Sequence, residues 1–150
     1  MVNSDYAVGF YFSLSFGGED AAFKEVSGIS KELSIEEVAS GGENRFKYRL
    51  PNISSSKNLI LKRAIVSSGS QLITWCSSTI DDGLANAIQT KDVAVNLLNN
   101  KGEVLVKWTF YNAYPVNYSV SDLKSQESEL VMETIELAYN YFDIKPSSSS

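Results

Sequence analysis

Apolar and polar residues alternate along much of the chain, which is the pattern of half-buried β-strands. In the first such segment, Phe10, Phe12, Leu14 and Phe16 share one predicted face. A Gly-Gly pair at 17–18 is typical of the turn that would end it. The alternation predicts strands over residues 9–16, 23–26, 33–38, 45–50, 59–66, 93–98 and 104–110.

The period changes over residues 70–82, where Leu72, Ile73, Cys76 and Ile80 recur at helical spacing. This predicts a short amphipathic helix with Trp75 at the margin of its apolar stripe. Ser70 is the predicted N-cap. Gly83 is expected to end the helix.

Two hairpins are predicted from turn residues between alternating segments. Asn99-Asn100-Lys101-Gly102 separates the strands at 93–98 and 104–110. A glycine-bearing tip at 40–44 separates 33–38 from 45–50, and a serine-rich loop at 51–57 follows. We expect the whole of 38–57 to be mobile in a lone subunit, because its flanking loops bury little in return for their lost backbone entropy.

Residues 129–142 fit two patterns. One face of a strand would hold Val131, Ile135, Leu137, Tyr139 and Tyr141. One face of a helix would hold Val131, Ile135, Ala138, Tyr139 and Phe142. Periodicity alone leaves both open. With six to eight strands, one short helix and no βαβ alternation, the chain is predicted to be mainly β, as a barrel or a sandwich.

Composition narrows the function. The chain of 150 residues has a net charge of −5, which disfavours specific nucleic-acid binding, since phosphate contacts need a basic surface. It has no histidine and one cysteine, so the commonest general base and any intrachain disulfide are excluded. No segment has the ~18 consecutive apolar residues of a membrane span, and we expect no secretory signal or membrane anchor.

Candidate chemistry is sparse. Neighbouring carboxylates at Glu36-Glu37 and at Glu133 and Glu136 would face apart on strands, so they are predicted to be solvated surface groups rather than a catalytic pair. Cys76 lies on the apolar stripe and is expected to be a buried, inert thiol. Two basic groups, Lys62-Arg63 and the trio Arg45, Lys47 and Arg49, are expected to meet acidic surfaces of partner subunits.

A series of segments, by order and spacing, resembles the tail tube family of contractile phages and extracellular contractile injection systems. The segments are 23–29 (FKEVSGI), 41–51 (GGENRFKYRLP), 58–63 (NLILKR), the helix bearing Trp75, 93–102, 108–110 (WTF), 112–116 (NAYPV), 121–123 (SDL) and 133–139 (ETIELAY). Ala64 and Asn117 depart from the family pattern, which has glycine and a basic residue there.

The resemblance implies a β-barrel-like pair of sheets with one packed helix, similar to the secreted ring protein of type VI secretion. It favours strand over helix for 129–142. It implies an N-terminal segment at 1–7, one tail tube domain at 8–144 and a disordered serine-rich tail at 145–150.

The implied function is that of a structural inner-tube subunit. Hexameric rings would stack into a hollow conduit for cargo or DNA, enclosed by sheath and ended by cap and baseplate or spike proteins. The particle would be assembled in the cytoplasm and released, without enzymatic activity or a cofactor. Contacts between subunits or rings are expected at Ser40, Gly41, Gly42, Glu43, Asn44, Arg45, Lys47 and Arg49. A type VI-like secreted ring and a monomeric ligand-binding β-barrel are the alternatives.

Overall fold

A computed structural model describes residues 10–32, 34–40, 43–52, 57–65, 70–83, 87–122 and 130–146. These contain ten strands and one helix. Their bounds are β1 Tyr11–Phe16, β2 Glu19–Phe23, β3 Glu25–Ser27, β4 Ser34–Ser40, β5 Glu43–Asn52, β6 Leu59–Ala64, α1 Gln71–Asp82, β7 Lys91–Leu98, β8 Val104–Val120, β9 Met132–Ala138 and β10 Tyr141–Pro146. The predicted mainly-β fold with one short helix is confirmed.

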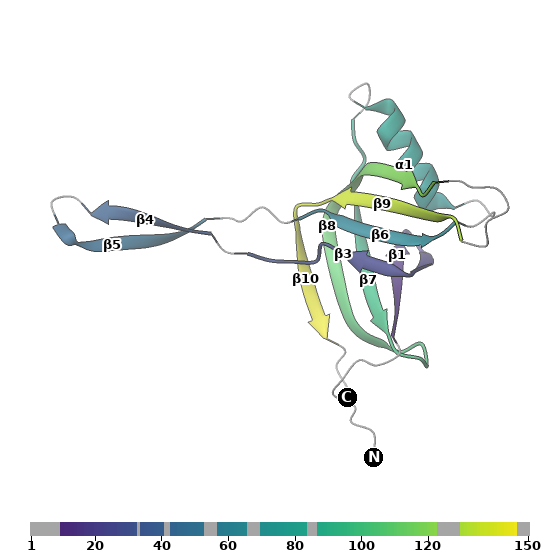
Figure 1. Ribbon diagram of the computed structural model, residues 1–150, viewed down its shortest axis with the longest axis horizontal. Helices are drawn as coiled ribbons and strands as arrows, with labels where there is room; N and C mark the ends of the chain where they lie inside the picture. The colour runs from purple at the N-terminus through teal and green to yellow at the C-terminus, as the bar shows by residue number, and fades with distance from the viewer. Residues whose placement is uncertain are drawn as a thin grey trace, which may run out of the picture.

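The main sheet is antiparallel and bends into two layers (Figure 1). Its strand order is β2-β1-β7-β8-β9-β6-β3, and β10 pairs with β8 beside this path. The long strand β8 belongs to both layers: its first part pairs with β7 and β10, and its last part with β9. The corner falls near Asn112, whose φ of 55° is rare for a residue other than glycine, and at the register shift after Pro115. The two layers match the predicted pair of sheets, and the sheet is not closed.

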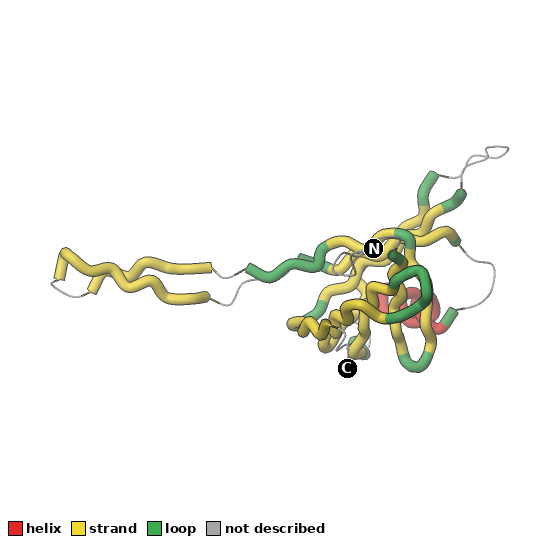
Figure 2. Tube along the Cα trace, turned by 90° about the horizontal axis from the view of Figure 1, so that it is seen from below, coloured by secondary structure: helices red, strands yellow, loops and turns green. Residues whose placement is uncertain are grey.

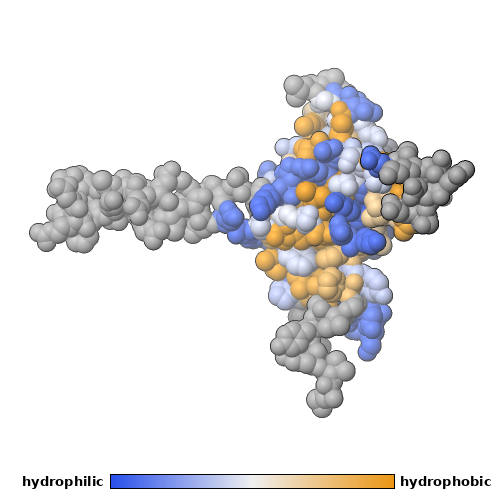
Figure 3. Space-filling view, in the orientation of Figure 1, coloured by the Kyte–Doolittle hydropathy of each residue, from blue (hydrophilic) through white to orange (hydrophobic). Residues whose placement is uncertain are grey.

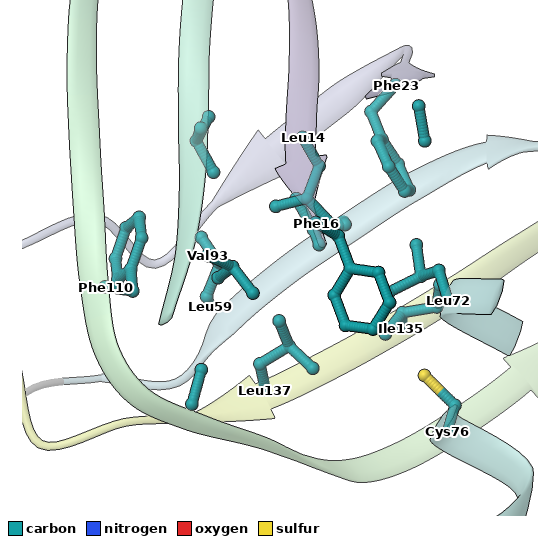
Figure 4. Close-up of a cluster of buried hydrophobic side chains, with 14 of the residues drawn as sticks. Leu14, Phe16, Phe23, Leu59, Leu72, Cys76, Val93, Phe110, Ile135 and Leu137 are labelled. Carbon is teal, nitrogen blue, oxygen red and sulfur yellow. The ribbon is translucent and has the colours of Figure 1, made fainter. Parts of the chain in front are cut away.

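The core lies between the two layers (Figure 4). Alternation along each strand places one set of side chains inward, and the face predicted for β1 is confirmed at Leu14 and Phe16. The alternating apolar residues of the predicted strands at 59–66 and 93–98 are buried at Leu59 and Val95. Other buried members are Phe23, Leu61, Leu72, Trp75, Cys76, Val93, Phe110, Ala113, Ile135, Leu137 and Phe142. Phe10, predicted to be inward, is 47% exposed because it precedes β1 at the end of the sheet.

Helix α1 packs against this core through a stripe that differs from the predicted one. Leu72, Trp75 and Cys76 are buried, whereas Ile80 is 39% exposed. Trp75 is held inward because its ring packs against Phe16 and its indole N–H donates to the carbonyl oxygen of Gln89 at 3.0 Å. Trp75, predicted to lie at the margin of the apolar stripe, is therefore part of the buried stripe, and Ile80 is outside it.

The cap of α1 also comes from an unexpected residue. Ser70 occupies the N-cap position, but its side chain makes no capping hydrogen bond. The carboxylate of Glu19 accepts hydrogen bonds from the Ser70 hydroxyl at 3.1 Å and from the Gln71 amide at 3.2 Å. A carboxylate is favourable there because unpaired amides and the positive end of the helix dipole meet at the first turn. Gly83 ends the helix as predicted.

Two strand predictions need correction. The segment at 23–26 is divided between β2 and β3 by a bend at Lys24. Within residues 130–142 the structure has strands and no helix, as the resemblance implies, but β9 ends at Ala138 and β10 begins at Tyr141, so Phe142 rather than Tyr141 faces the core. Lys145 and Pro146, predicted to belong to the tail, lie in β10 opposite β8.

Candidate assembly interface

The β4–β5 hairpin is the feature that stands farthest from the body. It projects as a separate arm in two views at right angles (Figure 1 and Figure 2). Its strands pair with each other from Ser34↔Asn52 to Ser40↔Glu43, with a register shift after Ala39. Among the described strands, neither pairs with any other. Its outer edges are therefore free for another chain.

The predicted contact residues divide along this hairpin. Ser40 ends β4, and Glu43, Asn44, Arg45, Lys47 and Arg49 lie in β5. Gly41 and Gly42 lie outside the described residues, as do 53–56 of the predicted serine-rich loop. An isolated two-stranded hairpin is marginally stable in water, so an arm of this kind gains stability when a second chain covers it.

The main sheet has edges of its own. β2 and β3 are the end strands of its path, and β10 pairs on one side with β8. Free edges tend to pair with other chains, and natural monomers usually cover or interrupt them. Edges left open among the described strands are thus candidate contacts between copies.

Exposed apolar side chains gather at the end of the sheet away from α1. Phe10, Tyr11 and Val104 are 47%, 59% and 40% exposed, and Ile144 of β10 is 51% exposed. Tyr141 is also more than half exposed, but it lies opposite Tyr111, next to the corner of β8. Figure 3 shows hydrophobic surface over this part of the body. The sequence prediction missed this surface, because alternation places residues on a face but does not show where the opposite layer stops. Exposed apolar patches of this kind mark contact surfaces.

One face of the β1–β7 region is short-chained and polar. Asn96 donates from Nδ2 to the hydroxyl oxygens of Ser13 and Ser15 at 3.2 and 3.1 Å, and Ser15 donates to Asp20 at 2.8 Å. These groups satisfy one another, whereas Lys107, directly across from Asn96 in β8, is an exposed charge on the same face. This is the second face predicted from the alternation of β1.

A buried polar network crosses the second layer and corrects two predictions. Glu133 and Arg63, predicted to be surface groups, are 2% and 7% exposed. The Arg63 Nε–H donates to Glu133 Oε1 at 2.6 Å, and the Tyr118 hydroxyl donates to Oε2 at 2.7 Å. The guanidinium also lies over the ring of Phe23, 5.1 Å from its centroid. Direct cross-strand pairing of Arg63 with Glu133 brings these residues together.

This network has the structure of a core element rather than a reactive site. Burial, followed by the hydrogen bond to Glu133, raises the pKa of Tyr118 to about 12. Burial, with Glu133 nearby, raises the pKa of the Cys76 thiol to about 12, so it stays protonated and inert as predicted. The charge of Arg63 acts in the opposite direction and lowers the pKa of Cys76, but by less than burial raises it.

The described residues offer little that resembles a catalytic, metal or membrane-spanning site. A surface pocket of about 310 Å³ lies beside α1 and is lined by Trp75, Asp82 and Ile88 among others. Within the described ranges, no group of three His, Cys, Asp or Glu side chains converges as metal ligands would. The one helix in those ranges is too short and too polar to cross a membrane.

Comparison with solved structures shows where this fold occurs. The tube-terminating cap of the anti-feeding prophage (AFP) contains a chain 22% identical, with TM-score 0.78, over 98% of this chain and 95% of that one. The PVC sheath–tube complex of an extracellular contractile injection system contains a chain 23% identical, with a TM-score of 0.79, over 96% of this chain and 94% of that one. Hcp1 from Flavobacterium johnsoniae is 18% identical, with a TM-score of 0.57, over 91% of this chain and 96% of that one. No curated protein matches the chain.

The family itself is shown by sequence. The model of the T4-like virus tail tube protein gp19 matches residues 8–143, nearly the whole chain. The two-layered sheet and packed helix agree with the fold of the solved structures. The chain therefore belongs to the T4-like tail tube family, whose members are structural tube subunits.

Proposed function

We propose that six copies of this chain form a ring and that rings stack head to tail into a hollow tube. The observation that carries this proposal is the combination of open sheet edges and a projecting hairpin without a strand partner in the described chain. Lateral contacts that close make a ring, whereas head-to-tail stacking does not close and makes a filament. A chain 25% identical occurs in the AFP baseplate, whose structure was symmetrised six-fold, which supports the hexamer.

The hairpin makes the contact between rings in this proposal. The residues concerned are Ser40, Gly41, Gly42, Glu43, Asn44, Arg45, Lys47 and Arg49. Three of these are basic, and the rest of a chain with net charge −5 is correspondingly acidic, so the arm and a neighbouring copy have complementary charge. Stacking should then weaken as salt rises, because exposed charges are screened.

The polar face of Ser13, Ser15 and Asn96 is the proposed lumen wall. These three side chains are short and already hydrogen-bonded to one another, so a cargo passing over them meets few free groups. Lys107 is the exposed charge on the same face. An acidic chain also repels polyanions, which favours sliding over binding if the cargo is DNA. The wall serves as a conduit, and the chain is proposed to have no enzymatic activity.

The partners follow from the particles in which similar chains occur. Those are a tube-terminating cap, a baseplate and a sheath–tube complex. We place this chain inside a sheath, between a baseplate and a cap, in a particle assembled in the cytoplasm and then released. A secreted type VI-like ring is the alternative, and it has weaker structural support at a TM-score of 0.57. A ligand-binding barrel is disfavoured because buried side chains fill the space between the layers.

Negative-stain microscopy and sedimentation of the purified protein test the proposal. Rings and stacked tubes are expected at high protein concentration. A stable 16.5 kDa monomer under all conditions would refute the tube. Co-expression with the sheath protein of the same particle separates the alternatives, since an inner tube is retained in sheathed particles and a secreted ring is not.

A further inference from the structure

Two chain segments lead from the body to the β4–β5 hairpin, one at Gly28 and one at Asn58, and they lie against each other at the body. Gly28 follows β3, and Asn58 precedes β6, so the antiparallel pairing of these strands brings the two residues together. Gly28 has φ of +90°, and a Cβ placed on it would overlap the carbonyl oxygen of Asn58 and lie 3.0 Å from its carbonyl carbon. Any larger residue at position 28 must therefore push the two chain segments apart.

The segment at Asn58 is also tied sideways to the sheet. Its side-chain Nδ2 donates to Glu136 Oε2 at 2.7 Å. Glu136 lies in β9, between β6 and β8 in the sheet order, opposite Ile60. Hydrogen bonds to a charged acceptor are short and strong, so this bond holds residue 58 against the middle of the layer.

The segment at Gly28 is tied to another strand. Ile29 packs against the hydrophobic core. Two residues later, the Lys31 ammonium lies over the ring of Phe142 at 4.6 Å from its centroid. Phe142 is 2% exposed and belongs to β10, so the ring is a fixed support. The segment at Asn58 is thus held by β9, and the segment at Gly28 by β10.

We propose that this root, formed by Gly28, Ile29, Lys31, Asn58 and Glu136, sets the direction in which the hairpin leaves the body. The root thereby sets the register in which the hairpin meets a second copy of the chain. The second statement rests on the proposed role of the hairpin in ring stacking. These residues are positioning residues, acting through the hairpin rather than touching the second copy.

The length of the arm shows why direction matters. β5 has 10 residues, which span about 33 Å at the usual rise of a strand. A rotation of about 10° at the root would move the far end by roughly 6 Å, more than the ~4.8 Å spacing of paired strands. A small error at the root therefore becomes a contact with the wrong strand or the wrong register.

The first experiment measures direction in the dispersed subunit. Spin labels are attached to cysteines replacing Ala22 in β2 and Ala39 in β4, in a Cys76→Ala background. The wild-type root should give a distribution centred on one distance, with only the width that motion of the hairpin itself adds. Asn58→Ala and Gly28→Ala should shift or broaden it while far-UV circular dichroism shows that the chain remains folded. An unchanged distribution in both variants, or a wild-type distribution as broad as theirs, would overturn the proposal.

Two further variants separate positioning from general stability. Lys31→Gln removes the contact with Phe142 at the root. Lys91→Gln is the matched control, because Lys91 lies over the buried ring of Phe16 at 5.1 Å, away from the hairpin. Lys31→Gln should broaden the distribution and Lys91→Gln should not. Equal broadening by the two substitutions would mean loss of packing rather than of position, and would count against the root.

The second experiment measures register in assembled tubes. Asn58→Ala should form rings, yet lower the stacked fraction at fixed concentration by about tenfold, as expected for loss of one well-aligned contact set. The tubes that remain should differ in helical twist by electron cryomicroscopy. If the wild type forms tubes and the variant forms tubes of the same yield and helical twist, the effect on register is refuted. Failure of the wild type to form rings or tubes would instead refute the proposed function, and the distance distributions would still decide whether the root directs the arm.

Discussion

Removing the Glu133 carboxylate by Glu133→Ala is expected to cost a large part of the stability of the subunit. The substitution leaves the Arg63 guanidinium 7% exposed and without its anion, and it removes the acceptor of the Tyr118 hydroxyl. Breaking a buried ion pair from one side typically costs about 3–5 kcal/mol. A whole domain is stable by about 5–15 kcal/mol, so the variant should lose from about a fifth to nearly all of its free energy of unfolding.

Urea denaturation of dispersed subunits, followed by tryptophan fluorescence, measures this cost. With a denaturant slope of about 2 kcal/mol per molar, the midpoint should fall by roughly 1.5–2.5 M. Glu25→Ala is the matched control, since Glu25 pairs with Lys62 at 3.8 Å and its side chain is 65% exposed. An exposed pair is worth at most about 1 kcal/mol, so the control midpoint should move little.

A double replacement then distinguishes a buried charge from a lost contact. Arg63→Met with Glu133→Leu removes both charges and keeps apolar volume, so it should be much less destabilising than either single change. Equal effects of Glu133→Ala and Glu25→Ala would refute the reasoning. An additive double replacement would show that the pair does not act as a unit.

Three further outcomes are expected. Cys76→Ala should lower the free energy of unfolding by on the order of 1 kcal/mol, and Cys76→Asp by several, because the aspartate buries an unpaired charge. A thiol reagent should react slowly with Cys76 in the native state, and rapid labelling would place Cys76 at the surface. The pKa values of Cys76 and Tyr118 are raised to about 12 from 9.0 and 10.0, so the folded chain keeps protons that the unfolded chain loses, and stability should fall as pH rises from about 9 to 12; a flat profile in a urea–pH series would contradict this. Amide exchange of β4 and β5 should slow when dispersed subunits stack into tubes, and equal protection in both states would contradict a role in stacking.

Sequence periodicity was sufficient for most strands of the body. Alternation depends on the two-residue repeat of a strand, so it predicted which residues of β1, β6 and β7 share a face without any knowledge of their partners. The turn at 99–102 predicted the β7–β8 hairpin for the same local reason. The order of short segments along the chain was also sufficient for the family, which the match over 8–143 confirms.

What the sequence left open depended on neighbours distant along the chain. The burial of Glu133 required Arg63, 70 residues away, to lie directly across from it, and no local pattern contains that pairing. Glu19 caps α1 from β2, 51 residues from Ser70, for the same reason. The sequence therefore predicted Glu133 to be a surface group and gave no role to Glu19.

The assembly surfaces show the same division. The sequence by itself determined a basic, alternating strand at 45–50 after a glycine-bearing tip, because alternation and turn residues are local properties. The tertiary structure decided that Phe10 remains exposed, because burial depends on how far the opposite layer extends. It also decided where the hairpin leaves the body, because Gly28, Asn58 and Glu136 meet only when β3, β6 and β9 lie side by side.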